Sequence, residues 1–538
     1  MGYFFPVLLR RCLLATPGTQ TGRAIPFTLI GSSRCFSSPT APTSERIDFP
    51  FEDDESSSSF AKSPDDLRSR IFRLRFPKRS ATAVIEKWVA EGRKASSQEL
   101  RRIAMDLRRS QRFKHALEIF MWLDSQSSFQ ASAADQAAKL DLIIKVDSLA
   151  NAELYFEQIS NTASQKVASL PLLHFYVKQK ELTKAEALLT KLCSLSFIVN
   201  PHHFNEIMKL YAATGQFKKV IYVIRYMKRN KVCLNVLSYN LWMNACGEVS
   251  DVASLEMIYK EMTVDNNVEV GWSTYCTLAN IYTRFGLADK AFAALRMAEN
   301  KLSTKKRLGY SFVMTNYAAL GDKNGVLRLW EFSKRVAGKI PCANYMSVMI
   351  CLVKLGDISE AERIFKAWES QCWKYDIRVP NILLGAHMRN GCMEKVELLF
   401  FHALKKGGNP NYKTWEILME GWVKKKEMDK AVEVMKKGLS MLKHCIWRPS
   451  SDILSAIAEY YEEIQNVDDA NRFVKVLQRS CLMNLHLYKS FVRTHVKAKR
   501  VNPNIPKMMA RDGIEPDEEI KLLIQQMTSI ISADIYVD

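Results

Sequence analysis

The sequence predicts an all-α protein, an α-solenoid of about twelve helix-turn-helix repeats of 35 residues. Three registers with this period support the prediction. The first consists of four glycines: Gly286, Gly321, Gly356 and Gly391. The second holds small or branched residues: Ala291, Val326, Ala361, Val396 and Ala431. The third holds large apolar residues: Leu295, Trp330, Phe365, Phe400 and Met435. A fixed period of about 20–50 residues indicates units that bury their apolar faces only against their neighbours.

One repeat, residues 272–306, is predicted to be a helical hairpin. Leu278, Ile281 and Tyr282 have the i, i+3, i+4 spacing of one face of an amphipathic helix. Gly286 is suited to end this helix, because glycine tolerates the left-handed backbone of a C-cap. Polar residues that can cap the second helix recur at one register: Asp289, Asn324, Ser359 and Asp429.

The array is predicted to extend in both directions from these units. The dipeptides Phe204-Asn205 and Tyr239-Asn240 are again 35 residues apart. Weaker units are predicted at residues 97–131, 134–163, 169–200, 412–447, 450–481 and 482–517. The repeat array therefore covers residues 97–530, and residues 531–538 form a C-terminal tail.

The best-kept units resemble the pentatricopeptide repeat. That repeat opens with an aromatic residue followed by asparagine, has a glycine near its middle, and ends in Pro-Asp or Pro-Asn. Residues 236–240 match the opening, while Pro410-Asn411 and Pro516-Asp517 match the ending. The tetratricopeptide repeat has a similar period, but its Trp-x2-Leu-Gly-x2-Tyr signature is absent from the sequence. The resemblance implies a right-handed superhelix that binds single-stranded RNA.

The residues ahead of the array are strongly basic. Residues 67–96 are predicted to form a basic helical lead-in, and residues 84–94 look like the opening of the P-class plant organellar subgroup, here mitochondrial. From Arg68 to Lys114 the sequence has fifteen basic and four acidic residues, a net charge of +11. Such a block favours polyanion binding, and its candidate phosphate ligands are Arg101, Arg102, Arg108 and Arg109. A solvated helix face, or attraction to an acidic protein, is the alternative.

The N-terminal segment reads as a targeting sequence. Residues 1–36 contain four arginines and no acid, which is typical of an organellar transit peptide. The sequence from Arg34 to Ser38 resembles a mitochondrial presequence cleavage site with the cut after Phe36, and a chloroplast peptide is the rival reading. Residues 37–66 form a Ser-rich acidic tract that is predicted to be a disordered linker.

The sequence offers no catalytic motif. It contains no Walker loop, dinucleotide fingerprint, nucleophile elbow or His-Glu-x-x-His. Its twelve cysteines include no Cys-x-x-Cys, so neither a zinc site nor a cytidine-deaminase-like appendage is indicated. No apolar run reaches about 18 residues, which argues against a membrane span. We therefore expect a protein that is not an enzyme and that needs no cofactor or metal.

The resemblance implies that two residues per repeat read one RNA base. The first follows the aromatic residue of the first helix, and the second is the last residue of the repeat. By this rule Asn205 pairs with Asn235 and Asn381 pairs with Asn411, and both pairs are assigned to pyrimidines. A poorer candidate pair is formed by Met346 and Asp376.

Other repeats depart from this rule. Asn240 has no clear partner, because one inserted residue blurs the end of its repeat. The first-helix position is occupied by Cys276, Ser311 and Glu416 in three further repeats. Few repeats thus carry a readable pair, which leaves room for RNA held mainly by its backbone.

The functional prediction is a mitochondrial RNA-binding protein that acts in the stability, processing or translation of organellar transcripts. The first alternative is a structural or assembly component of a ribonucleoprotein such as the mitochondrial ribosome, which would contact rRNA and ribosomal proteins. The second alternative is a solenoid adaptor that binds only proteins.

Overall fold

A computed structural model describes residues 66–74, 79–126, 129–194, 200–249, 252–441 and 447–534. All regular secondary structure in these ranges is helical, which confirms the predicted fold class. The chain divides into two compact units between Val270 and Gly271. The predicted transit peptide and nearly all of the predicted linker lie outside the described residues. Among the described helices, none combines the length and the apolar composition that a membrane span requires.

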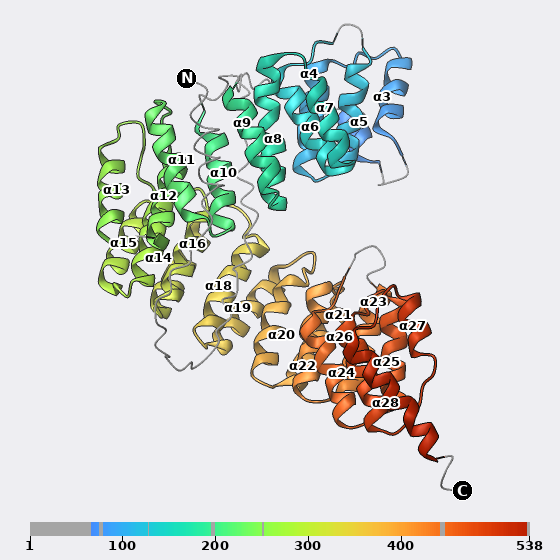
Figure 1. Cartoon of the computed structure of the whole chain (residues 1–538). Helices are drawn as coiled ribbons and strands as arrows, with labels where there is room; N and C mark the ends of the chain where they lie inside the picture. Colours follow the sequence, from blue (N-terminus) through green and yellow to red (C-terminus); the bar gives the residue numbers. More distant parts are fainter. Residues whose placement is uncertain are drawn as a thin grey trace. The chain divides into compact units, whose positions relative to one another are not determined.

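The first unit is a row of helical hairpins, which follow one another in chain order (Figure 1). Its helices are α2 (Leu67–Phe72), α3 (Ala81–Ala90), α4 (Ser97–Arg109), α5 (Phe113–Asp124), α6 (Ala133–Val146), α7 (Leu149–Gln158), α8 (Thr162–Gln179), α9 (Leu182–Ser194), α10 (Pro201–Ala213), α11 (Phe217–Arg229), α12 (Val236–Val249) and α13 (Val252–Val264).

The second unit continues the same pattern. Its helices are α14 (Trp272–Arg284), α15 (Ala288–Asn300), α16 (Leu308–Ala319), α17 (Lys323–Arg335), α18 (Cys342–Lys354), α19 (Ile358–Gln371), α20 (Arg378–Arg389), α21 (Met393–Lys405), α22 (Tyr412–Lys424), α23 (Met428–Met441), α24 (Ser451–Glu463), α25 (Val467–Arg479), α26 (Leu485–Lys497), α27 (Ile505–Arg511) and α28 (Glu518–Asp534). In the described part of the chain, the 24 helices α4–α27 pair into twelve hairpins.

The predicted glycine turn is present in the structure. Helix α14 ends at Arg284, and Gly286 follows with a φ of +73°. The Leu287 amide then donates to the Tyr282 carbonyl at 2.9 Å, which satisfies one of the last carbonyls of the helix. Glycines at the same register have φ values of +74° to +82°: Gly321, Gly356 and Gly391. One period later Lys426 occupies the same conformation at +61°, which costs free energy for a residue with a Cβ.

The predicted capping residues of the second helices are wrong by about two positions. Asp289 lies inside the first turn of α15, and its three register partners lie inside α17, α19 and α23. The cap of α17 is Asp322, whose carboxylate accepts from the Gly325 amide at 2.9 Å, and Asp357 caps α19 in the same way. The second helix begins two residues after the glycine, so the capping position comes directly after the glycine.

One predicted repeat boundary also differs from the structure. Helix α8 spans 18 residues and begins at Thr162, whereas the sequence placed a repeat start at residue 169. Pro171 lies buried inside this helix. Because proline in a helix interior removes a hydrogen bond and usually breaks the helix, a helix that continues through Pro171 is not expected from the residues alone.

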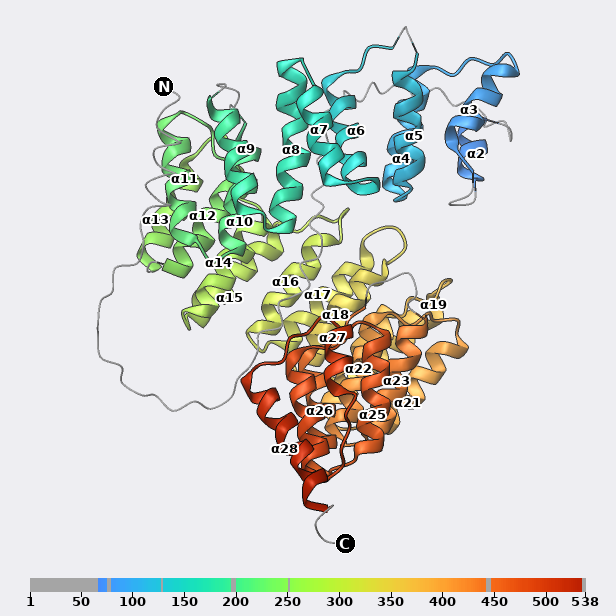
Figure 2. The same cartoon turned by 45° about the vertical axis from the view of Figure 1, so that its right-hand side comes forward.

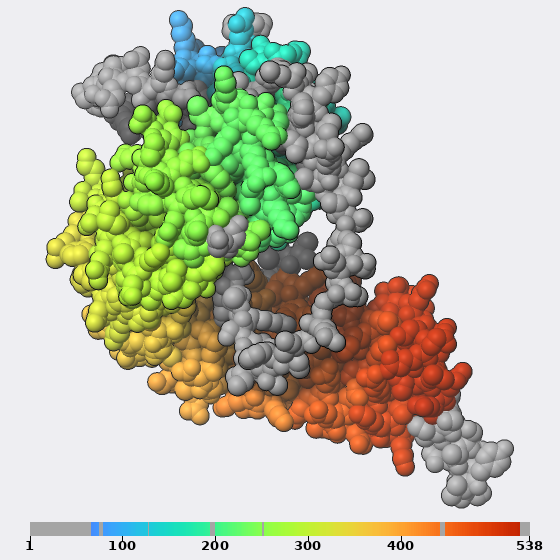
Figure 3. All heavy atoms as spheres, turned by 60° about the vertical axis from the view of Figure 1, so that its left-hand side comes forward, coloured from blue at the N-terminus to red at the C-terminus, as the bar shows by residue number. Residues whose placement is uncertain are grey.

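The core of each unit lies between stacked hairpins. Ala291, Leu295 and Ala361 are fully buried, and Trp330 and Phe365 are nearly so, as their registers predict. In the second unit the first helices of successive hairpins contact one another, as α22, α24, α26 and α28 do. Figure 2 shows α26 beside α28. The space-filling view shows the atoms of neighbouring helices packed against one another within each unit (Figure 3). This stacking brings residues about one period apart into contact.

Candidate nucleic-acid interface

The first predicted pair, Asn205 and Asn235, is brought together by the stacking of α10 on α12. The Asn205 side-chain amide donates to the Asn235 Oδ1 at 3.1 Å. A third residue, Ser238, completes the cluster, because its hydroxyl donates to the Asn205 Oδ1 at 2.8 Å. The Ser238 backbone amide also donates to the Asn235 Oδ1 at 2.9 Å, as at a helix N-cap.

The second predicted pair, Asn381 and Asn411, repeats this geometry between α20 and α22. The Asn381 Nδ2 donates to the Asn411 Oδ1 at 3.2 Å. The third residue is here Thr414, whose hydroxyl donates to the Asn381 Oδ1 at 3.0 Å. The backbone amide of Thr414 donates to the Asn411 Oδ1 at 3.1 Å, and the backbone amide of Asn411 donates to the Thr414 hydroxyl at 3.2 Å. Each predicted pair is therefore a three-residue cluster with the same bonds.

These bonds decide which groups remain available to a ligand. The oxygens of both asparagines in each cluster accept hydrogen bonds from within the protein. Among the described residues, the Nδ2 groups of Asn235 and Asn411 have no acceptor, and these two residues are partly exposed. Their partners Asn205 and Asn381 are 1% and 8% exposed, so their role is mainly to hold the pair. Each cluster presents hydrogen-bond donors.

The third predicted pair is not joined in the structure. Met346 is partly buried, and the Asp376 carboxylate is held by the Arg378 guanidinium at 2.6 Å. Burial opposes ionisation of Asp376, but the hydrogen bonds from Arg378 outweigh it and lower the pKa of Asp376. The Asp376 carboxylate is therefore committed to Arg378, the first residue of α20.

The candidate base-reading residues of other repeats also offer few polar groups to a ligand. Asn240 is buried, and its Oδ1 has no hydrogen-bond donor among the described residues. Burial raises the pKa of the Cys276 thiol to about 12, which keeps this position neutral. The Ser311 hydroxyl accepts from the Asn344 side chain at 3.2 Å.

Sequence reasoning missed the third member of each cluster. Ser238 and Thr414 lie 33 residues after the asparagine that they contact, at the third position of the next first helix. Asn344 stands in the same relation to Ser311. The signal was present in the sequence, since Asn-x-x-Ser and Asn-x-x-Thr at the start of a helix are capping patterns.

Two of the four predicted phosphate-binding arginines are engaged inside the protein. Arg101 holds Asp135 of α6 through two nitrogens, with the closest contact at 2.8 Å, and Asp135 is only 3% exposed. Arg108 contacts Asp141 of the same helix at 2.7 Å. These contacts again join residues 33 or 34 positions apart. They leave Arg101 and Arg108 poorly placed to bind phosphate.

The other two arginines are open to solvent. Arg102 is exposed, and the Arg109 side chain is 60% exposed with a 3.4 Å contact to Asp106. Elsewhere in the basic block, Arg112 donates to the backbone carbonyls of Phe72 and Leu74. Several basic residues of the block, Arg101, Arg108 and Arg112 among them, therefore join neighbouring helices within the protein.

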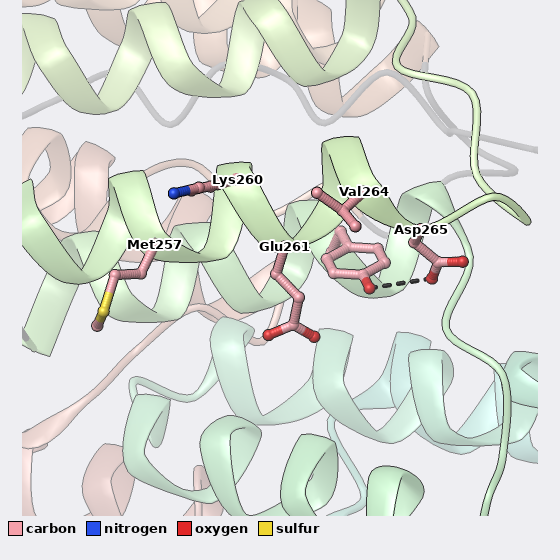
Figure 4. A pocket seen from close by; sticks show the side chains of 6 residues that line it. Met257, Lys260, Glu261, Val264 and Asp265 are labelled. Carbon is pink, nitrogen blue, oxygen red and sulfur yellow. Dashed lines mark hydrogen bonds between the residues drawn. The ribbon is translucent and has the colours of Figure 1, made fainter.

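A shallow cavity of about 490 Å³ lies beside the C-terminal half of α13 (Figure 4). It is lined by Tyr239, Met257, Lys260, Glu261, Val264 and Asp265. The Tyr239 hydroxyl donates to the Asp265 carboxylate at 3.0 Å. Burial, followed by this bond, raises the pKa of Tyr239 above its usual value. With two carboxylates and one lysine, the cavity is unsuited to phosphate.

No group of three or more His, Cys, Asp or Glu side chains in the described ranges could hold a metal ion. The buried His203 contacts the Ser169 hydroxyl at 2.9 Å. Burial lowers the pKa of His203 to about 4, so the ring is neutral near pH 7. This pair is another polar contact between consecutive first helices, 34 residues apart.

Known proteins resemble the chain over most of its length. Residues 187–249 match the pentatricopeptide repeat domain, and residues 344–371, 379–408 and 413–440 match the PPR repeat. The pentatricopeptide repeat-containing protein At5g27460 of Arabidopsis thaliana is 49% identical over 82% of this chain and 91% of its own length. The chain belongs to the pentatricopeptide repeat family. Membership of this family confirms that the chain is a repeat protein and not an enzyme.

Other pentatricopeptide repeat proteins are similar at greater distance. The mitochondrial protein At4g21705 of Arabidopsis thaliana is 30% identical over 85% of this chain and 94% of its own length. The crystal structure of the pentatricopeptide repeat protein PPR10 from maize covers 87% of this chain and 73% of that one, with 17% identity and a TM-score of 0.40.

Proposed function

We propose that this pentatricopeptide repeat protein binds single-stranded RNA in mitochondria and acts in the stability, processing or translation of organellar transcripts. The observation that carries the proposal is the pair of matching clusters, Asn205–Asn235–Ser238 and Asn381–Asn411–Thr414. Single-stranded RNA exposes its bases, and a helical repeat can read one base with two or three side chains.

The open donors indicate which bases these repeats bind. An amide nitrogen with free hydrogens requires an acceptor. Cytosine has two neighbouring acceptors, N3 and O2, on its base-pairing edge, whereas adenine has one acceptor, N1, beside a donor, and guanine has one acceptor, O6, beside two donors. Uracil offers carbonyl oxygens separated by an N–H. The clusters should therefore prefer pyrimidines, and cytosine over uracil.

The RNA backbone is proposed to contact the basic start of the array. Arg102 and Arg109 are the two candidate arginines whose guanidinium groups remain exposed. Their contribution would be independent of sequence and sensitive to salt. Different residues would thus recognise the RNA bases and bind the RNA backbone.

The binding proposal can be tested with a randomised pool of single-stranded RNA. The full-length chain would select RNAs from the pool, and sequencing would give the base preference at each position. We expect at least two positions that prefer pyrimidines. Cys276→Ala is a matched control, because Cys276 has the same register as Asn381 but belongs to no such cluster. Retention of RNA with no base preference would favour backbone binding or a ribonucleoprotein scaffold, and absence of binding would favour the protein adaptor.

The proposed location rests on residues 1–36, which carry four arginines and no acid. Removal of this segment on import should leave Ser37 as the first residue. N-terminal sequencing of protein isolated from mitochondria measures this directly. Protein that still begins at Met1 or Gly2, or that is recovered only from chloroplasts, would contradict the proposal.

A further inference from the structure

The contacts of Ser238 and Thr414 reach beyond helix capping. Each side chain is fully buried, and each lies at the third position of a first helix. A capping residue at this position usually serves its own helix. Here the hydroxyl also donates across to the preceding first helix, to Asn205 or to Asn381. Two repeats far apart in the sequence share this arrangement.

The hydrogen bonds of each cluster form a closed ring, and this ring fixes the orientation of the side-chain amide that would contact the base. In the second cluster the backbone amide of Asn411 donates to the Thr414 hydroxyl, which in turn donates to the Asn381 Oδ1. The Asn381 Nδ2 in turn donates to the Asn411 Oδ1. If the Asn381 side-chain amide were flipped, its Oδ1 would face the Asn411 Oδ1, and the Thr414 hydroxyl would keep only the Asn411 Oδ1, at 3.2 Å, as an acceptor. The hydroxyl therefore helps to keep the Nδ2 of Asn411 turned toward the ligand.

Other repeats keep the contact but change its chemistry. Between α16 and α18, the third-position Asn344 donates to the Ser311 hydroxyl. Between α4 and α6, the third-position Asp135 accepts from Arg101. In several repeats the third residue of a first helix thus contacts the candidate base-reading residue of the preceding first helix. The side chain of that third residue decides which polar groups of the candidate residue remain available to a ligand.

We propose that Ser238 and Thr414 are positioning residues for base specificity, since each fixes the amide orientation of the asparagine pair that precedes it. The proposal rests on the proposed RNA-binding function. It extends that function by making each pyrimidine site depend on three side chains, the third of which comes from the following repeat. The partner remains a pyrimidine base in single-stranded RNA.

The test compares hydroxyl-deleting variants with hydroxyl-keeping ones. Thr414→Val removes the hydroxyl at nearly constant volume, and Thr414→Ser keeps it. Ser238→Ala and Ser238→Thr form the corresponding set, and each conservative change is the residue that the other cluster already uses. The variants would first be checked by thermal unfolding, and then used to select from the randomised RNA pool.

Thr414→Val should weaken the pyrimidine preference at one position by about three- to tenfold, the range that one hydrogen bond supplies. The affected position is identified as the one that Asn411→Ala also changes. Thr414→Ser should retain the preference, and the position read by the first cluster should not change. Ser238→Ala should give the reciprocal result, and it covers the case in which Thr414→Val does not fold.

The outcomes separate the two proposals. If the wild-type chain shows no base preference, the reading function and the positioning role both fail. If the wild-type chain prefers a pyrimidine at the position changed by Asn411→Ala, but Thr414→Val and Ser238→Ala leave the preferences intact, only the positioning role is overturned. A uniform loss of affinity at all positions would likewise overturn it, because it would indicate a purely structural hydroxyl.

Discussion

The two asparagine clusters and the basic start of the array are both candidate RNA-binding regions, yet they use their polar groups differently. In the clusters, internal hydrogen bonds satisfy the side-chain oxygens and leave the Nδ2 groups of Asn235 and Asn411 open. In the basic region, the internal contacts of Arg101 and Arg108 occupy the groups that a phosphate would need. A local excess of charge in the sequence is therefore not the same as charge available to a ligand.

The largest expected effect concerns Arg101, whose loss would leave the buried Asp135 carboxylate without its main partner. Arg101→Ala should lower the free energy of unfolding by about 3 kcal/mol, the low end for a buried pair, because Arg101 itself stays partly exposed. Denaturant titration measures this change. The double change Arg101→Ala, Asp135→Ala should recover most of the stability. If Arg101→Ala left the stability unchanged and weakened RNA binding, Arg101 would bind RNA phosphate and not mainly Asp135.

The next effect concerns base reading. Asn381→Ala with Asn411→Ala should cost about 1–3 kcal/mol of discrimination at one RNA position, the range for a lost two-point base contact. Titration against the selected RNA and its single-base changes measures the loss. The dependence of affinity on salt should not change, because no phosphate contact is removed. A uniform weakening at every position would count against base reading by this cluster.

A smaller effect is expected from the exposed arginines. Arg102→Ala and Arg109→Ala should each reduce the slope of log K against log salt by about 0.7, if each contacts one phosphate of a single strand. All RNAs should be affected alike. Arg108→Ala is the internal control, because its guanidinium already contacts Asp141. An equal change of slope for Arg108→Ala would remove the distinction between engaged and open arginines.

The smallest expected effect is a change in the stability of the protein that leaves base recognition by the second cluster unchanged. Lys426 follows α22 in a left-handed conformation, one period after Gly391. Lys426→Gly should stabilise the protein by about 0.5–1 kcal/mol, since glycine adopts this conformation without a Cβ clash. Base preference should stay the same. A changed preference would mean that the geometry of the cluster depends on the turn that follows its helix.

Much of the fold could be predicted from the period alone. The glycine register located the turns and the apolar registers located the core, because each repeat packs on its neighbour in the same way. The start of α8 could not be placed, since Pro171 is tolerated inside that helix. The caps of α17 and α19 were missed by two residues, because the turn after the glycine is shorter than the sequence suggested.

The candidate site was predicted only in part. The asparagine pairs followed from the resemblance to the family, and the structure brings both of them together. Ser238, Thr414 and Asp135 were missed because their partners lie 33 or 34 residues away, on the preceding first helix. Contacts at this separation become visible only when consecutive repeats are superposed in space.

The spacing of the preferred bases tests the central claim most directly. The clusters begin on α10 and α20, which are five repeats apart in the chain. With one base per repeat, RNAs selected by the wild-type chain should have two pyrimidine-preferring positions five nucleotides apart. Asn235→Ala should remove the preference at one of them and Asn411→Ala at the other. Selected RNAs in which these two variants change the same position, or positions at any other spacing, would contradict the assignment of one base to each cluster.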